Sequence, residues 1–213
     1  MQQYRDQTRQ QLRVGTLPIL SQYGLTSLFR KFSEQYPQII LSLDEVEENE
    51  LMHGLDHGIY DIVIARNSMF SPEKYQTALL SEDRLAAIFP VFHPLADREV
   101  VTLENLAEER FILMKPYTSI YQLCMKLFAN SDIRPNILRT ARMESILGAV
   151  AAGEGISLLP EKNFQLFSHA SLTAVPLFSA PTLSVVAARK KAAPASAGTA
   201  QFWNDISSPV QRQ

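Results

Sequence analysis

The stretch from residue 143 to residue 160, MESILGAVAAGEGISLLP, constrains the fold more than any other part of the chain. The apolar side chains in its first half have helical spacing, namely Ile146, Leu147 and Val150. Gly153 stands where such a helix would end in the left-handed conformation. The apolar run 156–159 is too short for a helix, and Pro160 cannot donate the hydrogen bond that would extend a strand. The stretch therefore predicts a helix followed by a short buried strand.

The same alternation of strand and helix patterns runs along most of the chain. We predict strands at 12–16, 39–43, 61–65, 75–80, 85–89, 111–114, 137–140, 156–159, 172–177 and 183–187. We predict helices at 20–36, 47–56, 103–107, 120–130 and 143–152, with a closing amphipathic helix around Phe202. A strand, helix, strand order indicates parallel sheets with right-handed crossovers.

The pattern begins again after the turn at 93–95, which indicates a second lobe inserted into the first. The sequence predicts an α/β protein with two Rossmann-like lobes joined by two crossover strands. The first lobe is expected to be discontinuous, with residues 12–88 and 181–213, and the second lobe to hold residues 89–180. The polar residues 1–11 are interpreted as the end of a linker helix or the cut end of a longer chain.

Composition and charge are those of an ordinary folded protein. Of 213 residues, 46% are hydrophobic and 20% are charged, and no apolar run approaches the ~20 residues of a membrane helix. The start of the chain lacks an apolar signal segment, so we expect a cytoplasmic protein with no membrane partner. The net charge is −2 and no basic face is evident, so this chain alone is not expected to bind DNA strongly.

No catalytic motif is present, and the sequence predicts neither an enzyme nor a cofactor. Nucleophile elbows, zinc-protease motifs, phosphate-binding loops and Rossmann glycine triplets are all missing. His53 and His57 are four residues apart near Asp56 and Asp61, a spacing that metal ligands also have. Their helix is amphipathic, and we expect the two rings on its solvated face with no metal. Cys124 has helical spacing with apolar residues, which indicates a buried structural thiol.

In a protein of two open α/β lobes, helix N-termini and the carboxyl ends of strands meet at the gap between the lobes, where a carboxylate or phosphate is favoured. Three helix starts are predicted to face this gap, at 16–19, 115–119 and 142–145. Thr118 and Ser119 either cap a helix or contact a ligand. Arg66 either pairs with an anionic ligand or is a solvated loop residue.

The run AVAAGEGISLLP at 149–160 closely resembles the V-A-A-G-x-G-I-x-L-L-P signature of the effector-binding domain of LysR-type transcriptional regulators. Other segments resemble the family in the same order and spacing, namely LRVGT at 12–16, F-x-x-F-x-x-x-Y-P at 29–37, L-x-x-G-x-x-D-I-V-I at 55–64 and His93-Pro94-Leu95. The resemblance covers roughly residues 12–190. It implies a periplasmic-binding-protein-like (type 2) fold that senses a small metabolite.

Matched position by position, the resemblance implies a set of effector-binding residues. From the first lobe these are Thr16, Pro18, Ile19, Glu48 and Arg66. From the second lobe they are Thr118, Ser119 and Ile120, to which the predicted helix starts add Tyr117, Arg142 and Glu144. Pro18 and Ile19 stand where many members have Ser or Thr, and Glu48 would repel an anion.

The function that the resemblance implies is effector sensing by a LysR-type regulator. Such a protein acts as a homodimer, or a tetramer at full length, and binds promoter DNA through an N-terminal winged helix-turn-helix domain that is not expected within this chain. An alternative is a solute-binding protein of an uptake system with the same fold. An enzyme on this fold, such as a dehydratase or deaminase, is a third possibility, which the lack of a converging acid, base or nucleophile disfavours.

Overall fold

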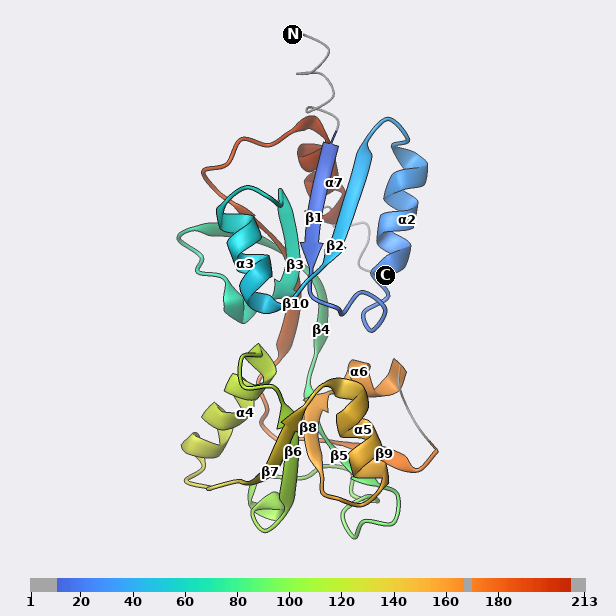
Figure 1. Cartoon of the computed structure of the whole chain (residues 1–213), viewed down its shortest axis with the longest axis vertical. Coiled ribbons are helices and arrows are strands. Elements are labelled where there is room, and N and C mark those ends of the chain that lie inside the picture. Colours follow the sequence, from blue (N-terminus) through green and yellow to red (C-terminus); the bar gives the residue numbers. More distant parts are fainter. Residues whose placement is uncertain (1–10, 167–169, 208–213) are drawn as a thin grey trace. The chain divides into compact units, whose positions relative to one another are not determined.

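The computed structural model describes residues 11–166 and 170–207. The chain divides into two compact α/β units, Met1–Glu82 with Ser184–Gln213, and Asp83–Leu183 (Figure 1). The boundaries expected after residues 88 and 180 differ from this division, because the strand β5 (Leu85–Pro90) pairs only within the second unit. The predicted linker end at 1–11 lies outside the described residues, apart from Gln11, which begins a strand.

The first unit is built on one five-stranded sheet. Its strands are β1 (Gln11–Thr16), β2 (Ile40–Glu45), β3 (Ile62–Arg66), β4 (Tyr75–Asp83) and β10 (Leu183–Lys190). Their order in the sheet is β2-β1-β3-β10-β4. β1 runs parallel to β2 and to β3, whereas β10 runs antiparallel to β3. The sheet therefore contains three parallel neighbours, β2, β1 and β3. The strand β10, which comes late in the sequence, lies between β3 and β4.

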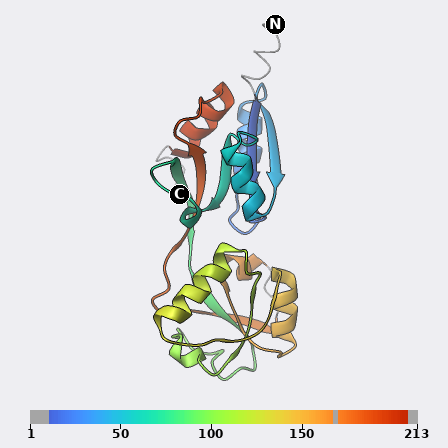
Figure 2. The ribbon, with the colours of Figure 1, turned by 60° about the vertical axis from the view of Figure 1, so that its left-hand side comes forward.

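Helices cover both faces of this sheet. They are α2 (Thr26–Gln35), α3 (Glu48–Asp56) and α7 (Ala197–Ser207), with a short 3-10 turn, η1 (Asn67–Met69). Figures 1 and 2 show α3 on one face and α7 on the other. α2 and α7 meet through Phe202, whose ring centroid lies 5.5 Å from that of Phe29 and 5.0 Å from that of Phe32. On the α3 side a Cβ at Gly15 would lie 2.6 Å from the Tyr60 ring, so glycine permits this close approach.

The second unit contains a three-stranded antiparallel part and a two-stranded parallel part. β5 lies between β8 (Ser157–Pro160) and β9 (Leu172–Pro176), and β6 (Arg110–Met114) pairs in parallel with β7 (Asn136–Ala141). A bridge from Phe111 to Ile156 links the two parts. Its helices are η2 (Glu104–Leu106), α4 (Ser119–Asn130), α5 (Met143–Ala151) and α6 (Glu161–Leu166).

The helix and strand predicted between 143 and 160 are confirmed as α5 and β8. Gly153 has a φ of +76°, the left-handed conformation expected after the helix, and β8 ends at Pro160. The helix α6, which starts directly afterwards, was not predicted, and the carboxylate of Asp83 accepts the Lys162 N–H at its start. The first helix begins at Thr26 rather than near residue 20, because the chain turns at Gly24, whose φ is +66°.

Candidate functional site

In the first unit, the predicted site residues lie where the parallel strands end. Thr16 ends β1 and Arg66 ends β3, and the Leu17 N–H donates to the Ile64 oxygen at 3.1 Å. Glu48 begins α3 three residues after β2 ends. We call this end of the sheet the carboxyl edge of the first unit. The structure brings all five first-lobe candidates to it.

Side chains near the end of β1 differ in what they offer a ligand. Thr16 is fully buried and its hydroxyl donates to the Leu17 oxygen at 2.8 Å, so that donor is already used. Ile19 is buried, whereas Pro18 is exposed. This segment therefore offers an apolar wall and backbone groups rather than hydroxyl donors.

Arg66 is a buried cation at the carboxyl edge whose hydrogen-bond partner is neutral. Its side chain is buried, with 5% of the residue exposed, so it is not a solvated loop residue. Its hydrogen bond runs from Nη1 to the Tyr23 hydroxyl oxygen at 3.4 Å, and no carboxylate in the described part of the chain lies within ion-pairing distance. A buried guanidinium without a counter-charge is costly, which makes an anion its natural partner.

Tyr23 is a contact that the sequence analysis missed. It lies in the turns between β1 and α2, and only its proximity to Arg66 in the folded chain marks it. A tyrosine in an irregular segment has no periodicity or spacing that would have indicated this contact. The phenol keeps part of the guanidinium in a fixed direction at the end of β3.

In the second unit, the candidates lie at the corresponding ends of β6 and β7. Met114 and Ala141 are neighbours in the parallel register, so the segments that follow them begin side by side. Tyr117 precedes α4, and Arg142 precedes α5 as its N-cap residue. The structure brings the six second-lobe candidates to this edge, where two helices of nine or more residues begin.

Thr118 caps α4, one of the two roles proposed for it. Its Oγ1 accepts the Tyr121 N–H at 3.3 Å and donates to the Lys115 oxygen at 2.8 Å. Because both contacts lie within its own turn, Thr118 orders the segment that carries Tyr117 and Ser119. Tyr117 is 46% exposed, and its ring is available to a ligand.

The two histidines lie together at the end of α3. The rings of His53 and His57 stack with centroids 4.0 Å apart, and His57 Nδ1 lies 2.9 Å from the His53 oxygen. Asp56 is bound by Tyr75 and Lys74, and Asp61 by Arg13. Among residues 11–166 and 170–207, no three His, Cys, Asp or Glu side chains are grouped so that they could hold a metal ion.

Cys124 lies in the core of the second unit. It is 1% exposed, and burial raises the pKa of its thiol to about 12. At neutral pH the thiol is therefore protonated and shielded, unlike the exposed thiolates that react with oxidants. The expectation of a buried thiol is confirmed.

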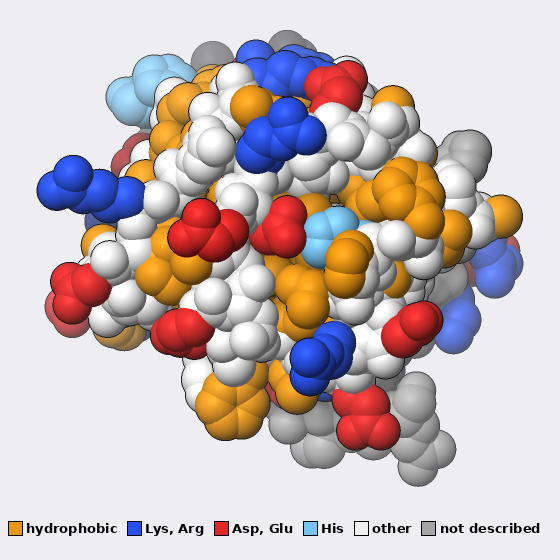
Figure 3. Space-filling view, turned by 90° about the horizontal axis from the view of Figure 1, so that it is seen from below, with side chains coloured by type: hydrophobic (Ala, Val, Ile, Leu, Met, Phe, Trp, Pro, Cys, Tyr) orange, Lys and Arg blue, Asp and Glu red, His pale blue; other side chains and the backbone are white. Residues whose placement is uncertain are grey.

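Charge on the visible surface is mixed. On the face in Figure 3, acidic and basic side chains are interspersed with hydrophobic ones, and no continuous basic patch is visible on that face. Within the described residues, no helix has the length and apolar character needed to cross a membrane.

The fold and the placement of these residues define a class. Open α/β sheets with polar side chains and helix starts at the carboxyl ends of parallel strands are typical of proteins that bind small molecules. Residues 5–208 match the model of one such family, the LysR substrate binding domain. The chain belongs to this family.

Curated relatives are regulators of transcription. The chain is 30% identical over 192 residues to the HTH-type transcriptional regulator TtuA of Agrobacterium vitis, a match that covers 86% of this chain and 62% of TtuA. It is 29% identical over 153 residues to the dual regulator OxyR of Escherichia coli K12, covering 70% of this chain and 49% of OxyR. The chain thus spans roughly half to three-fifths of the length of these relatives.

Solved structures support the same fold. The C-terminal domain of a probable LysR family regulator from Rhodococcus sp. RHA1 superposes with a TM-score of 0.81 at 25% identity, covering 93% of this chain and 98% of that one. The CcmR regulatory domain of Synechocystis PCC6803, solved with 2-PG, gives 0.82 at 21% identity, covering 95% and 98%. The BenM effector binding domain, solved with its effector benzoate, gives 0.76 at 24% identity, covering 92% and 91%. The predicted type 2 binding-protein-like fold and effector-binding family are confirmed, and the comparisons do not support the alternative of a solute-binding protein.

Proposed function

We propose that the effector of this domain is a small anion and that Arg66 is its main electrostatic partner. The observation that carries the proposal is the burial of this guanidinium with a phenol, and no described carboxylate, as its neighbour. In a site that excludes water, a charge-assisted hydrogen bond contributes about 1.5–3 kcal/mol, and a bidentate carboxylate or phosphate would use two such donors.

The effector is proposed to contact both carboxyl edges. The proposed residues are Thr16, Pro18, Ile19, Glu48 and Arg66 from the first unit and Tyr117, Thr118, Ser119, Ile120, Arg142 and Glu144 from the second. Support comes from their common position at the ends of parallel strands. BenM, which has the same fold, was solved with benzoate, a carboxylate. Glu48 and Glu144 are proposed to select against ligands with excess negative charge.

The domain is proposed to sense its effector without transforming it. A ligand that binds one arrangement of a protein more tightly than another shifts the populations by its difference in affinity, and a tenfold preference corresponds to about 1.4 kcal/mol. In the whole protein this shift would be passed to a helix-turn-helix domain that binds promoter DNA, as the description of TtuA suggests. A regulator of this kind works in the cytoplasm, which is the location we propose.

The whole protein is proposed to be a homodimer that assembles into tetramers. The strands at the ends of their sheets include β2 in the first unit and β7 in the second. Apolar side chains on them are exposed, with 61% of Ile40 and 44% of Leu138 accessible. Exposed strand edges of this kind favour pairing with another chain, and α2 and α4 are further candidate faces. Sedimentation velocity of Ile40→Arg tests the dimer, since a charge on this edge should yield monomers.

A ligand screen tests the proposed effector class. Thermal unfolding is measured with amino acids, aromatic acids and sugar phosphates, because a ligand present at 100 times its Kd stabilises the folded state by about 2.7 kcal/mol. Each hit is then titrated by calorimetry into the wild type and into Arg66→Ala with Ser119→Ala. We expect an anionic hit whose affinity falls at least tenfold in the double variant.

Arg30→Gln is the matched control, since Arg30 lies on α2 of the same unit and pairs with Glu34 at the surface. It should bind the hit as the wild type does. Unchanged affinity in the double variant would contradict the site, a neutral or cationic effector would contradict the ligand class, and product formation would contradict sensing without turnover.

A further inference from the structure

The chain that follows β1 folds against the end of β3. The Leu17 N–H donates to the Ile64 oxygen of β3 at 3.1 Å. Farther along, the Tyr23 hydroxyl accepts a hydrogen bond from Arg66 Nη1 at 3.4 Å, and the chain between these two contacts is a series of turns. Residues 17–23 therefore border the end of β3 that carries the buried guanidinium.

Residues 17–19 have no hydrogen-bond donor left for a ligand. The Leu17 N–H is used by β3, Pro18 has no N–H, and the Ile19 N–H donates to the Leu17 oxygen at 2.7 Å. Just before this segment, the Thr16 hydroxyl donates to the same oxygen at 2.8 Å. The three side chains are hydrocarbon, so a ligand that touches the segment meets hydrocarbon and carbonyl oxygens that already accept hydrogen bonds.

Arg66 is the one cation in the segments that follow the three parallel strands. Residues 16–20, 45–48 and 66–69 contain this arginine, no lysine and three glutamates. The paired N–H groups of a guanidinium match the two oxygens of a carboxylate. A phosphate monoester carries about two negative charges at neutral pH, and the second charge would lie among the glutamates without a cation. This edge therefore suits a singly charged carboxylate better than a phosphate.

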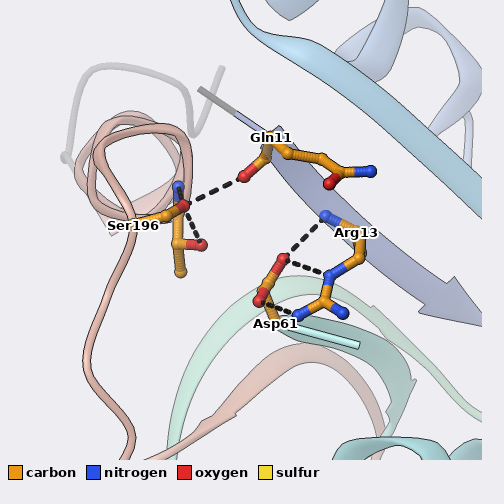
Figure 4. Close-up of polar contacts among 5 residues, drawn as sticks. Gln11, Arg13, Asp61 and Ser196 are labelled. Atoms are coloured by element: carbon orange, nitrogen blue, oxygen red, sulfur yellow. Dashed lines mark hydrogen bonds and ion pairs between the residues drawn. The ribbon is translucent and has the colours of Figure 1, made fainter. Parts of the chain in front are cut away.

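The opposite edge of the same sheet shows what an arginine of this protein does with a carboxylate. Arg13 donates to the Asp61 carboxylate from Nη2 at 2.8 Å and from Nε at 3.2 Å, and its backbone N–H donates to the same group at 2.9 Å (Figure 4). We expect Arg66 to make the same two-point contact with the carboxylate of a ligand.

We infer that the effector is a monocarboxylic acid with a hydrocarbon body, an aliphatic or aromatic acid rather than a sugar acid or a sugar phosphate. The inference rests on the anion site proposed above. The carboxylate would contact Arg66, and the neighbouring part of the body would pack on Pro18 and Ile19. A hydroxyl group placed there would lose its hydrogen bonds to water and meet no donor that replaces them.

Matched probe ligands test the inference. Hexanoate and gluconate have the same carbon chain and carboxylate but differ in their hydroxyl groups, and benzoate with 3,4,5-trihydroxybenzoate forms a second pair. Hexyl phosphate and phenyl phosphate replace the carboxylate of each hydrocarbon acid. Every probe is titrated by calorimetry into the wild type, up to about 10 mM and at matched ionic strength. We expect the tighter hydrocarbon acid to bind about tenfold or more tightly than its hydroxylated and phosphate counterparts.

Two pairs of variants isolate the effect of a hydroxyl group at the proposed contact. Ile19→Thr and Ile19→Val shorten the same side chain, and only the first adds a hydroxyl. The ratio of the Kd of the hydroxylated probe to that of the hydrocarbon probe should be about fivefold lower in Ile19→Thr than in Ile19→Val, because one hydrogen bond is gained. Pro18→Ser and Pro18→Ala repeat the comparison at an exposed position, where neither change disturbs the core.

Arg66→Ala separates this inference from the proposed anion site. It should weaken all probes by a similar factor, whereas the variants at 18 and 19 change the ratio within a pair. A hydroxylated or phosphate probe that binds as tightly as the hydrocarbon acid, and still depends on Arg66, would leave the anion site intact and overturn the inference. So would equal ratios within both pairs of variants. If no probe binds, or none depends on Arg66, the anion site itself fails and the inference fails with it.

Discussion

Two arginines occupy opposite ends of the sheet in the first unit and differ in how their charge is balanced. Arg13, at the amino end of β1, has a side chain that is 40% exposed and makes a two-point contact with Asp61. Arg66, at the carboxyl end of β3, is 5% exposed and has a tyrosine hydroxyl at 3.4 Å as its partner. The better-solvated cation has a carboxylate partner, whereas none of the described carboxylates pairs with the buried one.

This difference separates a structural arginine from a binding arginine. A partly exposed ion pair costs little desolvation and helps to fasten the loop before β3 to β1. A buried cation with only a neutral partner destabilises the unliganded protein. Such a residue is expected at a binding site, where an anionic ligand offsets this destabilisation. The contrast is more informative than the identity of either residue, since both are arginines at strand ends.

The largest expected effect comes from Arg66→Met, which keeps an unbranched apolar stem and removes the charge. Effector affinity should fall about 100-fold, equivalent to about 2.7 kcal/mol. The unliganded variant should unfold at the same temperature as the wild type or higher, because an unpaired buried charge has been removed. Calorimetry measures the affinity and differential scanning calorimetry the unfolding. A lower unfolding temperature would mean that Arg66 is structural, and the comparison would fail.

Asp61→Ala addresses the other arginine. It removes three hydrogen bonds to Arg13, and we expect a loss of about 1–2 kcal/mol, discounted because both side chains are partly exposed. Effector affinity should remain that of the wild type. Urea unfolding measures the change, and Arg30→Gln, which breaks an exposed pair on α2, should cost less than about 0.5 kcal/mol. Equal losses in the two variants would remove the structural role assigned to Arg13.

The pH dependence of stability tests a second ion-pair network of the first unit, around Asp56 at the end of α3. The hydrogen bond from Tyr75, followed by that from Lys74, lowers the pKa of Asp56 in the folded state. Its stabilisation is therefore present above the unfolded pKa of about 3.9 and is lost as the pH falls through the lower folded value. Asp56→Asn should lose less than about 1 kcal/mol at pH 7, because Asp56 is partly exposed.

The measurement is urea unfolding between pH 2 and pH 7. The gap in stability between wild type and Asp56→Asn should narrow toward the acid end. A gap that stays constant with pH would show that the carboxylate charge is not what stabilises this network.

The smallest effect is expected at Cys124, which lies in the core of the second unit. Its thiol, with a pKa raised to about 12 by burial, should not react with a thiol reagent in the native protein and should react once urea unfolds the chain. Cys124→Ser should leave effector binding unchanged. Rapid modification of the native thiol would show that the second unit opens at this core, and would make thiol chemistry a candidate function.

Much of the fold could be predicted because local patterns and tertiary structure agree. The apolar run of β3, the helix stop at Gly153 and the strand stop at Pro160 each follow from residues within a few positions. The six residues of α6 could not be predicted, because their start depends on Asp83, almost 80 positions away. The unit boundary was misplaced for a related reason, since β5 finds both of its partners beyond residue 156.

Some features of the candidate site could likewise be predicted from the sequence, and others could not. Positions at strand ends were predictable from the order of elements, but the burial of Arg66 and its contact with Tyr23 depend on how the loops fold back. Contacts between distant parts of the chain could not be predicted either, since the Ser196 hydroxyl donates to the Gln11 oxygen at 3.0 Å, 185 positions away. Spacing along the sequence carries no information about such contacts.

The position of β10 between β3 and β4 affects the order in which the chain can fold. The second unit is contiguous and can complete its core while the ribosome still holds the remainder, but the first unit must wait for residues after 183. Until then the nascent chain exposes an incomplete sheet, in which the apolar strand β3 can pair with β1 but not with β10. A premature stop before residue 184 should therefore leave an intact second unit attached to an aggregation-prone partner, a substrate for chaperones and proteases.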